Sequence, residues 1–357
     1  MEKNNINYFL GASSPMGFVS FFSELYDSDK KQRCYVLKGG PGTGKSTLMK
    51  NIADFLESKK YTVKRVHCSS DPNSLDAVIC DELNVSIADG TAPHVIEPIF
   101  PGAVENIINL GDYWDSAALS KNREKIIETS NENSFYHARC KRFLSAAGLM
   151  KTDSERLAGD ALYEYKLNGY ADRFSKRRFK KKDGVGRESK IFLSAITPLG
   201  VVFYPDTVKH YANEIIAVED NTAVASSLLL ERIKTLAIKN GYDVISAFCP
   251  LSPKGSPEHI IIPELSLAFI RKHSVYGQIE YTRTIHCSRF FDKTVLAKSK
   301  NRMAFNAKIQ AELLNEAILS LKNAKSVHDE LEKLYIPHMN FDKYDKLQKK
   351  IISDMMK

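Results

Sequence analysis

A glycine-rich run early in the chain has the residue types and spacing of a phosphate-binding loop. The run is Gly39, Gly40, Pro41, Gly42, Thr43, Gly44, Lys45 and Ser46, which fits G-x-x-x-x-G-K-[ST], and Thr47 follows it. Glycines let consecutive backbone N–H groups turn inward around a phosphate chain. In this pattern the lysine reaches the β- and γ-phosphates, and the hydroxyl after it binds Mg²⁺. We expect residues 39–47 to bind a nucleoside triphosphate, with Lys45 as a catalytic group and Ser46 as a metal ligand.

The residues on either side of the loop predict a strand before it and a helix after it. Residues 33–37 are apolar and β-prone, whereas Leu48, Ile52 and Phe55 recur at helical spacing. A strand, a glycine loop and a helix in this order point a helix N-terminus at an anion. A chance glycine-rich turn would require neither flank, so the context favours phosphate binding.

A second metal ligand is expected at the end of another strand. Residues 84–89 read as a strand that ends in Asp89. A carboxylate delivered to the rim of the sheet would hold Mg²⁺ together with Ser46. Many strands end in aspartate at a turn, so the assignment depends on the glycine loop upstream. With that loop present, we expect Asp89 to be the metal partner.

The catalytic base stays open at this point. No glutamate follows Asp89, the position from which many ATPases polarise the attacking water. Asp71, His94 and Glu97 are the candidates, and we favour Asp71. The alternative for Asp71, which precedes a proline, is to cap a helix or close a turn.

The chain also contains a long internal repeat. Residues 9–17 return as 192–200, and residues 61–63 return as 242–244. An offset of 181 places the helix after the glycine loop on residues 229–236 with its apolar stripe in register. We therefore expect two copies of one fold, packed as an intramolecular pseudo-dimer.

The second copy lacks the residues that would bind a phosphate. At the same offset the loop lysine faces Ser226, every loop glycine is replaced, and Glu219 and Asp220 stand where phosphates would come. An acidic loop without glycines can neither wrap nor attract a polyphosphate. An offset of 182 also sets Arg271 opposite Asp89. We expect one working nucleotide site and a degenerate second half that serves as scaffold or regulator.

The rest of the chain predicts further strands and appended helices. Residues 61–68 alternate as a strand, residues 74–83 read as a short helix, and residues 260–271 cover the matching ground in the second copy. Residues 103–172 are mostly helical by pattern, and residues 303–334 are an uninterrupted candidate for a long helix. Each half is therefore expected to append helices after its sheet.

Residues 173–190 form a strongly basic segment between the copies, with nine basic residues and two acids. Such a run favours a solvated tether. A second interpretation is a patch for nucleic acid or another polyanion, with Phe174 and Phe179 available for stacking.

Four arginines elsewhere are candidate arginine fingers between the halves, with packing roles as the alternative for each. They are Arg139, Arg142, Arg283 and Arg289.

Composition bounds the class of protein. A length of 357 residues suits two domains, and 43% hydrophobic with 26% charged residues is typical of a soluble globular chain. The start has no apolar core of signal-peptide length and no apolar run reaches membrane-spanning length, which predicts a cytoplasmic protein without a membrane partner. Six cysteines are scattered without a C-x-x-C pair. Neither zinc nor a redox motif is therefore expected.

Several motifs together carry a family resemblance. They are the glycine loop, residues 67–72 (HCSSDP), 89–94 (DGTAPH) and 101–104 (PGAV), and the repeated F-L-x-A…P-x-G segments. With them the chain resembles a group of little-characterised bacterial proteins, mainly from spore-forming Firmicutes, built from two tandem P-loop NTPase halves. The resemblance extends along almost the whole chain. It implies ATP binding and hydrolysis at residues 39–47 and supplies no substrate. The second half of that family usually keeps a glycine loop, and this chain departs there.

We therefore expect an α/β fold of two tandem P-loop NTPase-like domains, each a three-layer αβα sandwich on a mostly parallel sheet, with appended helices. The first domain covers residues 1–172, the basic linker 173–190 and the duplicated domain 191–357. The expected function is Mg²⁺-dependent ATP binding and hydrolysis in the first half, and ATP is favoured because no N-K-x-D guanine signature is evident. The alternatives are a small-molecule or nucleotide kinase that uses the same loop, and a nucleotide-gated nucleic-acid-binding module.

Overall fold

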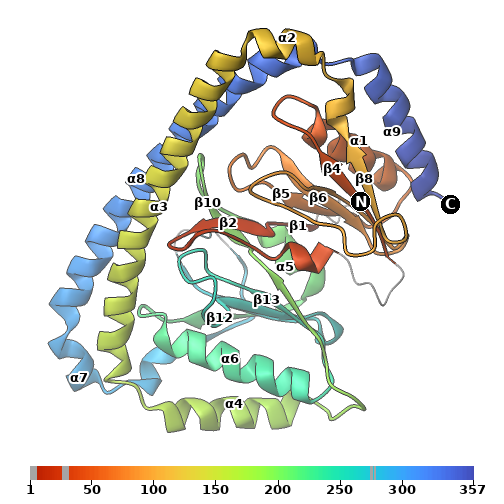
Figure 1. The fold of residues 1–357 in the computed structure, drawn as a ribbon. Coiled ribbons are helices and arrows are strands. Elements are labelled where there is room, and N and C mark those ends of the chain that lie inside the picture. The colour runs from red at the N-terminus through yellow and green to blue at the C-terminus, as the bar shows by residue number, and fades with distance from the viewer. Residues whose placement is uncertain (1–5, 26–31, 274–275, 277–278) are drawn as a thin grey trace.

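The computed structural model describes residues 6–25, 32–273, 276 and 279–357. It is an α/β protein in two halves, each built on a six-stranded sheet (Figure 1). The first sheet has the order β1-β5-β6-β7-β4-β8. All neighbours in it run parallel except β6, which is antiparallel to both β5 and β7. Its strands are β1 (Ile6–Tyr8), β4 (Arg33–Lys38), β5 (Lys64–His67), β6 (Leu75–Cys80), β7 (Val85–Asp89) and β8 (Glu105–Asn109).

The second sheet repeats the first strand for strand. Its order is β9-β13-β14-β15-β12-β16, and β14 is the strand that runs antiparallel to both neighbours. The strands are β9 (Glu188–Ile191), β12 (Glu214–Glu219), β13 (Val244–Ala247), β14 (His259–Ile262), β15 (Leu267–Arg271) and β16 (Arg283–His286). Two sheets with the same order and the same directions are what the internal repeat predicts. Both are mixed and mostly parallel.

Two small hairpins lie between the sheets at the centre of the molecule (Figure 1). They are β2 (Gly11–Ser14) with β3 (Gly17–Ser20), and β10 (Ser194–Thr197) with β11 (Gly200–Phe203). Phe9 and Phe192 exchange two backbone hydrogen bonds, each with an N···O distance of 2.9 Å, and both side chains are fully buried. The two copies therefore meet around a reciprocal contact, as the two halves of a symmetric dimer would.

A pair of long helices forms an arm that arches over both halves (Figure 1). Helix α3 (Arg123–Gly159) of the first half packs along α8 (Lys300–Tyr335) of the second, so the long helix predicted there is confirmed. Each arm helix crosses to the opposite half. After α3, α4 (Glu164–Arg178) packs on α6 (Val224–Lys239), and after α8, α9 (Phe341–Met355) packs on α1 (Lys45–Ser58). Across the described residues, no helix is apolar enough over its length to span a bilayer.

The two crossings use the same contacts. The backbone N–H of Asp115 donates to the carbonyl of His338 at 2.9 Å, and that of Asp292 donates to Ala161 at 2.8 Å. Asp292 lies 177 positions after Asp115, and His338 lies the same number after Ala161. The halves have thus exchanged equivalent arms. The other helices given for the described residues are short: η1 (Phe22–Leu25), η3 (Leu110–Tyr113), α2 (Ser116–Lys121), α5 (Pro205–Tyr211), η4 (Pro263–Leu265), η6 (Cys287–Phe290), α7 (Lys293–Lys298) and η7 (Ile336–His338).

One secondary-structure prediction was wrong. The helix expected at 74–83 is strand β6, in which every residue is buried. A strand covered on both faces reads as a continuous apolar run, and such a run cannot be told from a buried helix by periodicity. The stretch 103–172 is mostly helical, as predicted, although it begins with strand β8.

The basic segment is not a tether between the halves. Residues 173–178 belong to helix α4, and β9 begins at Glu188 inside the 173–190 range. Phe174 and Phe179 are buried, and the Phe174 ring packs edge-on against Phe269 of the second sheet at 5.2 Å between centroids. Neither ring is available for stacking on a base. The basic residues of this segment are divided between the end of α4, the connection after it and β9.

Candidate functional site

The glycine loop (residues 39–46) joins β4 to α1, in the strand–loop–helix order that the sequence predicts. Gly42 has φ +68° and Gly44, which caps α1, has φ +83°. Side chains other than glycine are strained in this region of backbone space. A Cβ at Gly42 would also lie 2.9 Å from the Ile336 side chain, and one at Gly44 would lie 3.0 Å from the Tyr344 ring. Both glycines are therefore required by the backbone path and by close packing.

Lys45 is held against the loop in this structure. Its Nζ donates to the carbonyl oxygens of Gly39 at 2.6 Å and Gly40 at 2.9 Å, and lies 3.7 Å from a carboxylate oxygen of Asp89. The Thr43 hydroxyl also donates to Gly40 at 2.9 Å, which closes the loop. The ammonium group is mostly buried and already faces an acid, so Lys45 lies at the point where loop and strand converge.

Ser46 and Asp89 are placed by the strands beside the loop. The Ser46 hydroxyl accepts a hydrogen bond from the backbone N–H of Leu75, at the start of β6, at 3.0 Å. Asp89 ends β7 and pairs in register with Leu37 of β4. One of its oxygens accepts from the backbone N–H and the hydroxyl of Thr91, while the other faces Lys45. Asp89 thus faces Lys45, and Ser46 follows Lys45 at the start of α1.

The three candidate bases differ in their surroundings. The Asp71 carboxylate accepts hydrogen bonds within its own turn, from the Asn73 N–H at 3.1 Å and the Ser74 hydroxyl at 2.9 Å, and it pairs with Lys325 of α8 at 3.5 Å. This is the turn-closing role that was its alternative. The Glu97 side chain is 78% exposed and pairs with a lysine on β4. His94 is buried and lies beside Cys68 and Asp76.

Asp76 is a buried acid that sequence reasoning missed. The pairing of Ala77 with Ala88 in adjacent antiparallel strands sets Asp76 opposite Asp89 in the same register. Asp76 is 3% exposed, and burial raises the pKa of its carboxyl group to about 6, with nearby His94 opposing the rise. The signal was present as the one charged residue in an apolar strand, but the helical interpretation of 74–83 concealed it.

The end of α8 and helix α9, both from the second half, cover the glycine loop, and no sequence motif predicted this contact. The Glu332 carboxylate of α8 accepts a hydrogen bond from the Gly42 backbone N–H at 3.3 Å. The Tyr344 hydroxyl of α9 donates to the Gly44 carbonyl at 2.7 Å. A hydrogen bond with His328 lowers the pKa of Glu332, so its carboxyl group is ionised at neutral pH. An acid thus engages one of the N–H groups that would face a phosphate.

The corresponding loop of the second half is closed by its own acid. The Asp220 carboxylate accepts from the Thr222 N–H at 2.9 Å and from the Ser226 N–H at 2.8 Å, at the start of α6. Helix N-terminal N–H groups are the ones that would bind an anion. Asp220 supplies that negative charge internally, and Glu219 forms ion pairs with Lys272 and His286. An N–H group in the first turn of α6 is thus already occupied by a carboxylate of its own loop.

The candidate arginine fingers have partners of their own. Arg139 lies in α3 and pairs with Glu316 of α8 at 3.7 Å. Arg283 lies in β16 and pairs with Glu214 at 3.7 Å, over the ring of a buried phenylalanine. Arg142 lies in α3 and Arg289 in η6. The structural roles that were the alternative fit Arg139 and Arg283.

Comparison with known proteins gives a partial match. Residues 20–87 match the model of the family described as Nephrocystin 3, N-terminal. That segment contains β4, the glycine loop, α1, β5 and β6, and it stops short of Asp89. No curated protein and no solved structure matches the chain. The comparisons do not confirm the tandem bacterial family, and the chain is similar to the Nephrocystin 3 N-terminal family over the glycine loop and the strands around it.

Proposed function

We propose that the first half binds ATP with Mg²⁺ at residues 39–47 and hydrolyses it. The observation that carries the proposal is the convergence of the glycine loop, Lys45 and Asp89 at the carboxyl ends of β4 and β7. Backbone N–H groups of residues 42–46 cradle the phosphates, and Lys45 neutralises charge that develops on the γ-phosphate. Ser46 and Asp89 hold Mg²⁺.

The second half acts as scaffold or regulator in this proposal. Because the Asp220 carboxylate already satisfies the N-terminus of α6, we expect the chain to bind about one ATP, not two. Calorimetric titration of the full-length chain with ATP and Mg²⁺ measures this stoichiometry. The whole chain is required because each half contributes helices that pack on the other. Two equivalent sites would contradict the proposed division of roles.

Phosphate release from ATP alone tests the reaction. Steady release without an added acceptor supports hydrolysis, whereas ATP binding without release would favour transfer to an unidentified acceptor. The structure offers little for the kinase alternative at Asp71, because that carboxylate is engaged by its own turn and by Lys325. The nucleic-acid alternative has lost its stacking residues, since Phe174 and Phe179 are buried.

Replacing Glu332 by glutamine is expected to strengthen ATP binding. The Glu332 carboxylate accepts the Gly42 N–H and places a negative charge where the triphosphate would lie. Glutamine keeps the acceptor but removes the charge, and a hydrogen bond to a charged group is stronger than a neutral one by about 1 kcal/mol, which corresponds to about a fivefold lower Kd. Titration of the variant beside the parent measures the change. Glu330→Gln is the matched control, because Glu330 is 64% exposed and pairs with Lys333 instead. Equal affinities of the Glu332 variant and the parent would remove the proposed competition.

A further inference from the structure

Three side chains with metal-binding atoms meet in the interior beside the glycine loop. Cys68 follows β5, Asp76 lies in β6 and His94 follows β7, and their ligand atoms all lie within 4.8 Å of one another. His94 Nε2 is 3.4 Å from Asp76 Oδ1. Asp76 is 3% exposed and His94 is 7% exposed. The three groups come from three separate segments that the sheet brings together.

The cluster contains buried polar atoms without partners. Within the described part of the chain, Asp76 Oδ2 and His94 Nδ1 form no hydrogen bond. A buried carboxylate is unfavourable unless a cation or hydrogen-bond donors compensate for the lost water. The Lys45 ammonium group favours the ionised form of Asp76 from a distance, but it is engaged by two loop carbonyls and faces Asp89. Among the described residues, no lysine or arginine pairs with Asp76, and its ion-pairing partner is His94.

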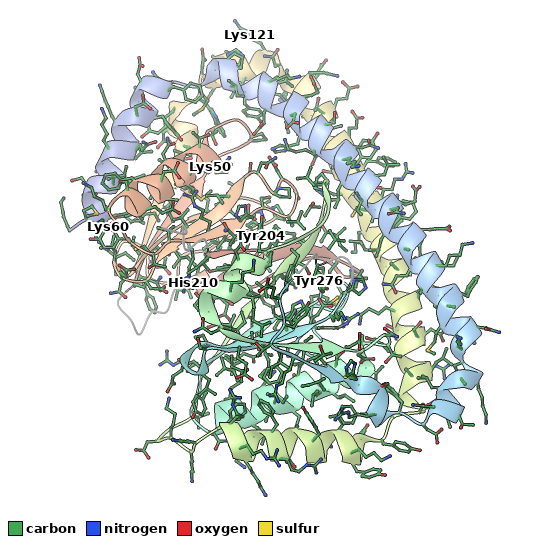
Figure 2. The ribbon with its side chains drawn as sticks, turned by 180° about the vertical axis from the view of Figure 1, so that it is seen from behind. Lys50, Lys60, Lys121, Tyr204, His210 and Tyr276 are labelled. Carbon is green, nitrogen blue, oxygen red and sulfur yellow. The ribbon has the colours of Figure 1, made fainter. Side chains whose placement is uncertain are left out.

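In the second half, the residues that correspond to Cys68, Asp76 and His94 include an acid paired with an arginine. The repeat sets Cys249 on Cys68 at an offset of 181, and Glu258 on Asp76 and Tyr276 on the histidine at 182. There Arg271 lies 2.8 Å from Glu258, and the Tyr276 hydroxyl donates to the same carboxylate. Figure 2 shows Tyr276 inside the second half, toward the centre of the molecule. The copy that lost the glycine loop has thus replaced the histidine and neutralised the acid with a guanidinium.

The surroundings of Cys68 and His94 suit a bound metal. The Cys68 Sγ lies within 4.8 Å of the ligand atoms of both Asp76 and His94. The rings of Phe18 and Phe22 pack on His94 with centroid distances of 4.8 and 5.0 Å, which fixes the imidazole. Ligand side chains in metal sites are oriented by contacts of this kind.

We infer that Cys68, Asp76 and His94 bind a Zn²⁺ ion. A thiolate, an imidazole and a carboxylate form a donor set that suits Zn²⁺, whereas Mg²⁺ prefers oxygen ligands alone. Three protein ligands leave a fourth position for water, as in zinc sites that take part in reactions. The zinc site is distinct from the Mg²⁺ proposed at Ser46 and Asp89 and does not depend on nucleotide binding. The absence of a C-x-x-C pair, which argued against zinc, does not apply to ligands drawn from three segments.

Metal analysis of the full-length chain tests the site. The protein is stripped with a chelator, reloaded with Zn²⁺ and passed over a desalting column, and we expect about one Zn²⁺ per chain. Cys68→Ser and His94→Gln should each lose the retained zinc. Cys249→Ser, the matched change in the second half, should keep it. With Co²⁺ in place of Zn²⁺, a thiolate-to-metal charge-transfer band should appear in the parent and vanish in Cys68→Ser.

Circular dichroism of each variant separates loss of the metal from loss of the fold. If a variant fails to fold, Asp76→Asn, which keeps the side-chain shape, replaces it in the same assay. Zinc retention in Lys45→Ala would show that the site stands apart from the nucleotide site. The inference is overturned if the reloaded parent retains no zinc, if Cys68→Ser retains as much as Cys249→Ser, or if excess Mg²⁺ displaces the Zn²⁺.

Discussion

Lys45→Ala is expected to lower ATP turnover by about 10²–10³-fold, since removal of one group that stabilises transition-state charge has an effect of this size. In the structure the Lys45 ammonium group already lies at the loop, 3.7 Å from the Asp89 carboxylate. With a triphosphate bound, the same group would turn from the loop carbonyls to the β- and γ-phosphates. Steady-state phosphate release by parent and variant at saturating ATP measures the effect.

The control for this variant is Lys50→Ala, which removes a positive charge from the same helix (Figure 2). Equal melting temperatures of parent and variants would show that the loop still folds without the two Lys45 hydrogen bonds to Gly39 and Gly40. A Lys45→Ala protein with the turnover of the parent would refute the proposed site. A similar loss in Lys50→Ala would point to damage of α1 and not to catalysis.

The glycine loop could be located from the sequence because its constraints are local. Positive φ at Gly42 and Gly44, and a strand and a helix on either side, are properties of neighbouring residues and leave a readable pattern. The position of Asp89 at the end of a strand could be predicted for the same reason, and that strand lies beside β4. The repeat also gave the topology of the second sheet once the first was known.

What the sequence could not show depends on contacts between distant segments. The pairing that sets Asp76 opposite Asp89 requires β6 to be a strand, and burial on both of its faces removes the alternation that would reveal it. Glu332 and Tyr344 reach the loop because the arms cross between the halves, a choice that local patterns do not encode. Because of the same crossing, residues 173–178 belong to the packed helix α4 and not to the expected linker.

The exchanged arms give the second half a physical route to the first site. Glu332 and Tyr344 belong to the second copy, yet they hydrogen-bond to Gly42 and Gly44 of the first. A ligand that takes the Gly42 N–H must displace the carboxylate and so disturb the end of α8. Under the proposed function, the free energy of that displacement would couple nucleotide binding to the position of the arm, and coupling of this kind is reciprocal. Glu332→Gln therefore tests both affinity and coupling.

Arg271→Met is expected to destabilise the protein by about 3–5 kcal/mol, because it leaves a buried carboxylate without its counter-charge. The Glu258 side chain is 3% exposed and lies 2.8 Å from the Arg271 guanidinium in the core of the second half. Urea unfolding of the full-length chain measures the loss. The double variant with Glu258→Gln removes both charges and keeps an acceptor for Tyr276, so most of the stability should return. If Arg271→Met alone is as stable as the parent, Glu258 does not need a cation, and the same argument would fail for Asp76 in the first half.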